Sequence, residues 1–406
     1  MKRSIILFLT LVCGTLAFSQ KAETIESIVS NSHEADWYAA QMEAWQKVID
    51  ANPQDEWAWR NLFRATYYHD SFTAGWGNSW EEQDKTKTAD VVRQIEDHFP
   101  DSYVSNLCKC CFALSKDSIP SRRGDFVRRA VELMPENACA EDINYLACRM
   151  WIADPESPLV NELFTKSYRN KYYPARIMQF NRNMLLSMEP NAIYFPNGDL
   201  DSAPMKILQE ALGERKDVTI INVSFLHADS FMNALYKKLG IKPLTLNLQD
   251  YGKYGDDWAR HYEADIIMYL IRESGRPAYL SPTNPNSSIL DKDSIYNEGL
   301  VLKYSPKPYD NFAVALHNVK EVYNLEYLAE PDLVYDNWET SERMDSNHIT
   351  LLANLISKFR KKGDTAQAER LYNILSKCAE RCSARNTDSP KERKAYYDNL
   401  LKEQLQ

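Results

Sequence analysis

The residues best suited to chemistry lie in one short acidic segment, NGDLDSAP at residues 197–204. Asp199 and Asp201 stand two positions apart, a spacing that could direct both carboxylates onto a cation or onto sugar hydroxyl groups. Asn197 and Ser202 add an amide and a hydroxyl to the same segment. A simpler role is also open, because Asp201 or Ser202 can cap a helix that begins after them. The sequence therefore leaves two interpretations, a ligand-binding loop and a capped turn.

Other reactive side chains are scattered. His227, in the segment FLHAD, could face the same edge as Asp199, or it could be a hydrogen-bonded structural residue. Residues 250–265 concentrate aromatic and acidic side chains, which could cover that edge or cap the helix that follows. No dinucleotide-binding, phosphate-loop, zinc-protease or serine-hydrolase motif occurs. We therefore expect a protein that is not an enzyme and has no metal and no cofactor.

Two tryptophans mark a candidate surface for a protein or peptide partner. Trp76 and Trp80 lie in a long predicted loop between helices, flanked by glycine and acidic residues. No helical register requires their burial, so they either fasten the loop down or act as binding anchors.

The elements that position the acidic segment alternate between strand and helix. Runs of β-branched and aromatic residues predict strands at 192–195, 218–226, 277–281 and 300–305, with helices at 204–213, 229–239 and 257–274 between them. This alternation indicates a mostly parallel sheet. Ligands of such sheets bind at the carboxyl ends of the strands, where the acidic segment follows the first predicted strand.

The flanking regions are helical and repetitive. Pro53, Pro100 and Pro135 each separate two amphipathic helices, and a hairpin recurs around Gly363. A period near 34 residues is typical of tetratricopeptide-like repeats, which stack to bury their apolar faces. The predicted fold class is α plus α/β, with tetratricopeptide-like helical repeats flanking a small, mostly parallel α/β module. The predicted parts are a signal peptide at 1–19, a helical domain at 20–190, the α/β module at 191–330 and a helical hairpin at 331–406.

The N-terminus has the features of a secretory signal peptide. Lys2 and Arg3 are basic, residues 5–18 are apolar, and AFS before Gln20 supplies small residues for cleavage. The apolar stretch is short for a membrane span. We expect a periplasmic or secreted mature chain without a transmembrane segment, and the odd number of cysteines left in it implies at least one thiol.

The net charge excludes one class of partner. The chain has 48 Lys and Arg against 57 Asp and Glu, a formal net charge of -9. Nucleic-acid binding requires a positive face, and no sustained run of basic residues provides one. We therefore expect no nucleic-acid partner.

Several segments, in the same order, resemble a known membrane-protein family. NGDLDSAPMKILQEALGERKDVTIINVSFL resembles the segment after the last membrane span in the bacterial protein O-mannosyltransferase-like membrane family. RPAYLSPT, EGLVLKYSP and the helical tail extend the resemblance over about residues 190–380. The family's membrane spans and its membrane-proximal acidic residues have no counterpart here, and Ser202 stands where the family has threonine. The resemblance thus implies a shared soluble module without transferase activity.

Two functions follow as hypotheses. The first is an exported, non-catalytic interaction scaffold that binds protein or peptide partners in the cell envelope. The alternative is a glycan-binding or carbohydrate-active protein that uses the acidic loop 197–204. A ligand site predicts that acidic and aromatic side chains converge at one edge of the sheet, whereas a scaffold predicts exposed aromatic side chains in a helical groove.

Overall fold

The computed structural model describes residues 21–75, 79–117, 120–290, 292–330, 338–384 and 390–405. The predicted signal peptide and Trp76 lie outside these ranges. The chain divides into two compact units, Met1–Ile25 with His33–Pro100, and Glu26–Ser32 with Asp101–Gln406. The domain boundaries expected near residues 190 and 330 stay predictions.

The first unit is helical. Its helices are α1 (Ala35–Ala51), α2 (Glu56–Thr73), α3 (Trp80–Gln83) and α4 (Lys87–His98). Asp55 caps α2 by accepting a hydrogen bond from the backbone N–H of Ala58 at 3.1 Å. Trp59 is buried, as its helical position predicts, and its indole N–H donates to the carbonyl of Pro53 at 2.9 Å. The hairpin of α1 and α2 around Pro53 is therefore held by a cap and by a buried indole.

The second unit begins with paired helices. These are α5 (Tyr103–Cys111), α6 (Pro120–Glu132), α7 (Ala140–Ala153), α8 (Pro158–Arg169) and α9 (Ala175–Ser187). Pro135 lies between α6 and α7, as the repeat pattern predicts. Leu146, Leu163 and Ile177 come from three of these helices and are fully buried. The helices therefore bury their apolar faces against one another, as stacked helical repeats do.

A five-stranded sheet follows α9, in the order β2-β1-β3-β5-β4. The strands are β1 (Ile193–Phe195), β2 (Thr219–Ile220), β3 (Ala278–Leu280), β4 (Ile295–Asn297) and β5 (Leu302–Tyr304). β1 pairs with β2 and β3 in parallel, whereas β5 pairs with β3 and β4 antiparallel. The α plus α/β class is confirmed, and the sheet is mixed because the β4–β5 hairpin adds to its parallel part.

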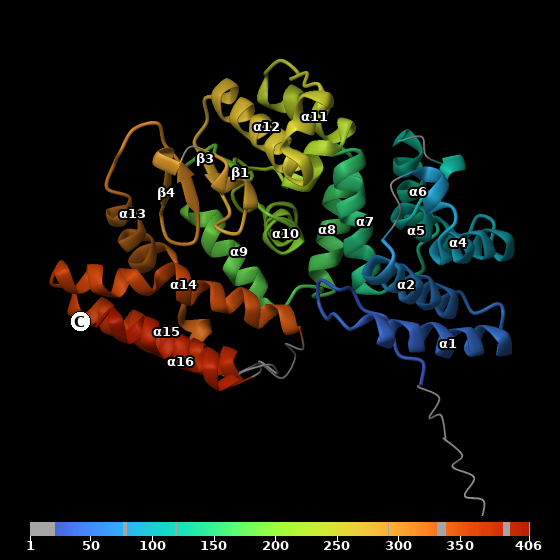
Figure 1. The fold of residues 1–406 in the computed structure, drawn as a ribbon, viewed down its shortest axis with the longest axis horizontal. Coiled ribbons are helices and arrows are strands. Elements are labelled where there is room, and N and C mark those ends of the chain that lie inside the picture. The colour runs from blue at the N-terminus through green and yellow to red at the C-terminus, as the bar shows by residue number, and fades with distance from the viewer. Residues whose placement is uncertain are drawn as a thin grey trace, which may run out of the picture. The chain divides into compact units, whose positions relative to one another are not determined.

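The helices between the strands lie close to their predicted positions. They are α10 (Ala203–Leu212), α11 (Asp229–Leu239), α12 (Trp258–Ser274) and α13 (Asn311–His317). α11 and α12 lie on one side of the sheet and α9 and α10 on the other (Figure 1). The strand predicted at 218–226 is shorter, since β2 ends at Ile220 and the 3-10 helix η3 (Val223–His227) begins soon after it. Asn222 starts η3 by accepting a hydrogen bond from the Ser224 N–H at 3.0 Å.

The C-terminal helices are α14 (Glu339–Lys361), α15 (Thr365–Ala384) and α16 (Pro390–Glu403). Gly363 joins the first two with a φ of +80°, a conformation that glycine adopts without strain. α14 packs against α9, the last of the paired helices (Figure 1). At this contact the buried carboxylate of Asp345 is 3.3 Å from Arg176 of α9 and 2.7 Å from Arg381 of α15. The hairpin is thus fastened to α9 by a buried carboxylate.

Two general features concern the chain as described. None of the seven cysteines in the described ranges forms a disulfide, and the sulfur atoms of Cys378 and Cys382 pack 3.8 Å apart. Within the described ranges, no helix has both the length and the apolar character needed to cross a membrane.

Candidate functional site

The three parallel strands create a switch point at the carboxyl edge of the sheet. β1 lies in the middle, β2 on one side and β3 on the other, so the connections leaving β1 and β2 run in opposite directions across the sheet. In sheets of this kind, ligands bind outside the carboxyl ends of the strands at that point. The loops after β1, β2 and β3 meet there, at residues 196–202, 221–228 and 281–288.

Buried amide groups hold these loops together. The side chain of Asn284, after β3, donates to the carbonyl of Phe195 in β1 at 3.1 Å. The side chain of Asn222, after β2, donates to the hydroxyl of Ser202 at 2.9 Å. Because both amides are fully buried, they fix the relative positions of the three loops.

Asp201 and Ser202 have internal partners. The Asp201 carboxylate accepts hydrogen bonds from the backbone N–H groups of Asn197 and Gly198, at 2.9 and 2.8 Å. The Ser202 hydroxyl donates to the carbonyl of Gly198 at 2.7 Å. Both side chains are buried, and burial raises the pKa of Asp201 although the two N–H donors oppose the shift. These residues shape the turn and offer little to a ligand.

Asn197 and Asp199 face solvent instead. Surrounding protein displaces water from the Asp199 carboxyl and raises its pKa, and the Arg149 guanidinium on α7 acts in the opposite direction. Burial raises the pKa of Cys148, which lies on α7 beside Arg149, and the charge of Asp199 raises it further. Of the two carboxylates in the acidic segment, Asp199 is therefore the one that a ligand can reach.

His227 belongs to a bridge across the carboxyl edge. Its Nε2 lies 2.8 Å from one oxygen of Glu263 on α12, and the other oxygen accepts from the Asn286 amide at 2.9 Å. His227 follows β2 and Asn286 follows β3, so Glu263 connects the strands that flank β1. The Asn286 side chain is fully buried, and within the described chain its Oδ1 has no hydrogen-bond partner.

Aromatic side chains cover one part of this edge. His227 stacks on Tyr262, with ring centroids 5.5 Å apart and an angle of 21°, and Trp258 lies 6.5 Å from His227. Tyr254, just before α12, stacks on His261 of α12, with ring centroids 3.7 Å apart. Trp258 and Tyr254 are 40% and 38% exposed. We call His227, Tyr254, Trp258 and Tyr262 the aromatic platform.

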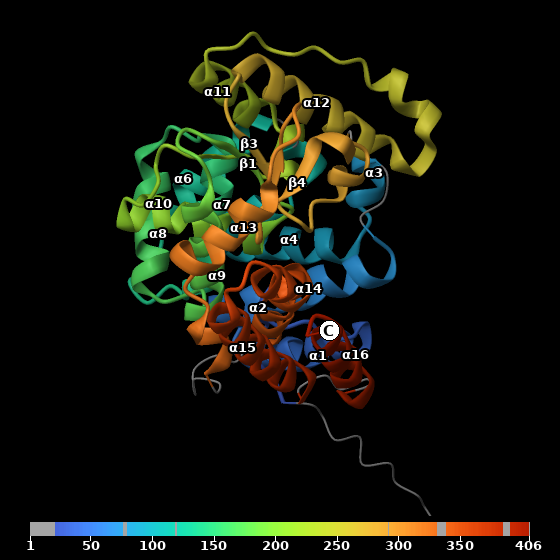
Figure 2. The ribbon, with the colours of Figure 1, turned by 90° about the vertical axis from the view of Figure 1, so that its left-hand side faces the viewer.

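A cavity of about 120 Å³ lies beside this platform. It is bounded by α11, α12 and the extended segment 243–246, and its lining includes Tyr262, Asp229 and Asn233. Figure 2 shows the segment after α11 running to the 3-10 helix η4 (Leu248–Asp257), which precedes α12. The platform therefore adjoins a hollow with polar groups.

The sequence located the acidic segment but not the whole edge. The interpretation of 250–265 as a helix cap is wrong, because the Asp257 side chain makes no capping hydrogen bond to α12. Glu263 lies within the segment 250–265 that the sequence singled out as a possible cover of this edge, whereas sequence reasoning missed Asn286, which lies 59 residues after His227. No spacing motif connects them, and only the order of the strands could have indicated that their loops meet.

The candidate partner-binding residue Trp80 lies in the first unit, whereas this edge belongs to the second. Trp80 is 39% exposed on the short helix α3, which Ser79 caps by accepting from the N–H of Glu82. Across the described ranges, no group of three or more His, Cys, Asp or Glu side chains is arranged to hold a metal ion.

The fold and the edge define a class: an α/β module with a parallel-strand switch point, flanked by α-helical hairpins. Residues 177–264 match the family described as TMEM260-associated domain 2. The match runs from α9 into α12, about a fifth of the chain, and contains all five predicted ligand residues together with Glu263. Comparison with curated proteins and with solved structures gave no match.

Proposed function

We propose that the chain is an exported, non-catalytic binding protein whose α/β module holds a glycan at the aromatic platform. The observation that supports this most is the convergence of exposed aromatic rings with Glu263 and His227 at the carboxyl edge of the sheet. This convergence is the arrangement expected of a ligand site.

The chemistry of a sugar fits such a surface. The C–H groups on one face of a pyranose ring are apolar and pack against aromatic rings, while its hydroxyl groups need hydrogen-bond partners. Trp258 and Tyr254 provide exposed rings, and His227 provides a polar edge beside them. The side chains of Asp229 and Asn233 in the adjoining cavity add acceptors and a donor.

The hydrogen bonds at the edge support binding rather than glycoside hydrolysis. Glycosidases use two carboxyl groups on either side of the scissile bond. Both oxygens of Glu263 already have partners, and Asp201 is buried and bound to backbone N–H groups. Among Asp199, Asp201 and Glu263, Asp199 is then the one carboxylate that a ligand can reach.

A second candidate function is the binding of a protein partner by the first helical unit. Trp57, Phe72 and Trp80 are exposed there by 41%, 48% and 39%. Exposed tryptophans are frequent anchors in protein interfaces. Replacing Trp57 and Trp80 with alanine and measuring capture of envelope proteins against the melting temperature tests this function.

The resemblance to the protein O-mannosyltransferase-like membrane family supports a limited proposal. We take it to mean that the two share a soluble module over about residues 190–380, without the transfer of sugar. Export is proposed from the basic and apolar N-terminus.

A matched pair of variants tests the glycan proposal. Labelled protein is applied to a glycan array, and the affinity for the glycans retained is then measured by calorimetry. We expect Trp258→Ala to weaken binding by about tenfold or more, since it removes about 1.4 kcal/mol or more of contact. Trp57→Ala is the control, because it removes an equally exposed tryptophan from the other unit. Equal binding by the two variants, or no retained glycan, would refute the glycan proposal.

A further inference from the structure

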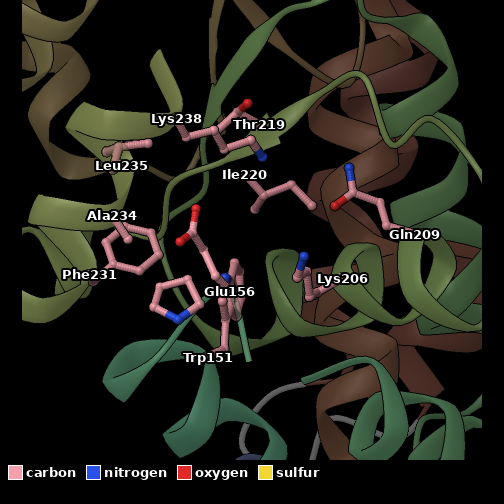
Figure 3. A pocket seen from close by; sticks show the side chains of 11 residues that line it. Trp151, Glu156, Lys206, Gln209, Thr219, Ile220, Phe231, Ala234, Leu235 and Lys238 are labelled. Atoms are coloured by element: carbon pink, nitrogen blue, oxygen red, sulfur yellow. The ribbon is translucent and has the colours of Figure 1, made fainter. Parts of the chain in front are cut away.

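A second cavity lies away from the aromatic platform. It has a volume of about 80 Å³ and is lined by the end of α7, by α10 and α11, and by β2. Figure 3 shows its side chains, with none of the platform residues among them. A ligand bound there would be separate from one bound at the platform.

The floor of the cavity is aromatic. Trp151 and Phe231 are 4% and 3% exposed, and their ring centroids lie 6.2 Å apart in an edge-to-face arrangement. Phe225 packs edge-on against the same indole at 5.0 Å. Because these rings are held by one another, the floor is a rigid apolar surface.

Two lysines point into the space above this floor. The ammonium groups of Lys206 on α10 and Lys238 on α11 approach it from different sides (Figure 3). Lys206 lies 5.6 Å above the Trp151 ring and is paired with Glu210. Lys238 has no ion-pair partner among the described residues, and its side chain reaches solvent at the mouth.

The electrostatics around Lys238 are unfavourable without an anion. Surrounding protein displaces water and lowers the pKa of Lys238, and the charges of Lys206 and Arg276 lower it further. Glu210 opposes these effects only in part. The two cations outweigh the one carboxylate, Glu210, and Lys238 has no counter-ion of its own among the described residues.

The edge strand adds a backbone donor. The N–H groups of Thr219 and Ile221 are bound to the carbonyls of Ala192, just before β1, and of Tyr194 in β1, each at 2.8 Å. In a parallel pair, alternate residues direct their N–H groups to opposite sides of the strand. The N–H of Ile220 therefore points away from β1 at the outer edge of the sheet, and Ile220 itself lines the cavity.

We infer that this cavity binds the oxyanion head group, carboxylate or phosphate, of a small organic ligand whose apolar part rests on Trp151 and Phe231. The anion bridges the ammonium groups of Lys206 and Lys238 and accepts from the N–H of Ile220. The volume is about half that of a cavity that takes benzene, about 150 Å³, so the ligand is small, with its head group between the two lysines and a short apolar part on the floor. Glu156 at the mouth is bound to Lys237 at 3.0 Å and repels a second negative charge.

Calorimetric titration of the full chain with sodium acetate and with inorganic phosphate tests this inference. Chloride keeps the ionic strength constant, and a dissociation constant on the order of 1 mM is expected for the better probe. The probe that binds more tightly distinguishes a carboxylate ligand from a phosphate ligand. Lys238→Met should weaken binding by about tenfold while keeping the length of the side chain.

Lys242→Met is the matched control, since it removes the same charge from an exposed lysine that does not line the cavity. It should bind each probe within about twofold of the natural chain. Equal losses in the two variants would show a general effect of charge and overturn the inference. Absence of heat from both probes up to about 50 mM would overturn it as well. Glycan binding at the platform should be unchanged in Lys238→Met, which separates this site from the proposed function.

Discussion

The histidine His348 makes the second unit sensitive to acid. It is fully buried on α14, its Nε2 lies 3.1 Å from the hydroxyl of Tyr327, and its Nδ1 lies 3.1 Å from the carbonyl of Asp345. The neutral ring satisfies both partners when Nδ1 carries the proton and Nε2 accepts from the tyrosine. Burial lowers the pKa of His348 to about 4, and the charge of Arg381 acts in the same direction.

The sign of the effect follows from proton binding. Between the ordinary pKa of 6.5 and the folded pKa of about 4, the unfolded chain binds a proton that the folded chain does not. The free energy of unfolding therefore falls as the pH is lowered through this window. The lowered pKa corresponds to at most about 3 kcal/mol of stability, most of which is lost by about pH 4.5.

Urea denaturation at a series of pH values from about 7.5 to 4.5 measures this loss. In His348→Gln the side chain is neutral throughout, so the loss of stability between these pH values should be smaller than in the natural chain by about 2 to 3 kcal/mol. His317→Gln, which changes an exposed histidine of the same unit, should leave the dependence unchanged. Parallel curves for the natural chain and His348→Gln would refute the reasoning.

Further substitutions test the turn, the buried charges and the backbone. Asp201→Ala should lower the free energy of unfolding by about 1 to 3 kcal/mol, because two partly buried N–H groups lose their acceptor; unchanged stability with loss of glycan binding would instead make Asp201 a ligand residue. Asp345→Ala should cost about 3 to 5 kcal/mol in urea denaturation, because Arg176 and Arg381 each lose a buried ion-pair partner; a loss below about 1 kcal/mol would contradict this. Gly299→Ala should destabilise the chain by more than Gly363→Ala in thermal melting. At Gly299, with a φ of +108°, an added Cβ would lie 2.8 Å from a tyrosine hydroxyl, whereas nothing lies within 4 Å at the other glycine; the reverse order would be evidence against this packing. Finally, N-terminal sequencing should find mature protein that begins at Gln20, and molecules that begin at Met1 would oppose export.

The alternation of elements could be predicted from the sequence because each element has a local signal. α11 (Asp229–Leu239) agrees with its predicted range, and β1 and β3 lie within theirs. The misses have local causes too. β2 stops early because the Asn222 side chain starts a 3-10 helix, which strand propensity does not register. β4 is three residues long and only partly buried, so its sequence, IYN, carries no alternating pattern.

The candidate site was only partly predictable, for a different reason. The acidic segment is local, so Asn197 to Ser202 could be identified as a unit. Which of its carboxylates is accessible depends on buried contacts that the sequence does not display. The bridge of His227, Glu263 and Asn286 depends on the order of strands in the sheet, and this order results from pairings between distant segments.

The segment that matches the family is smaller than the sheet it belongs to, because β1 lies between β2, which is inside the match, and β3, which is outside it. The family match ends at residue 264, before β3 begins at Ala278. A fragment restricted to the match would expose one whole side of β1, whose residues are fully buried in the intact chain. Such an open apolar edge pairs readily with other chains and aggregates. A fragment of residues 177–264 therefore needs a strand equivalent to β3, from a longer chain or from another molecule, to close this edge.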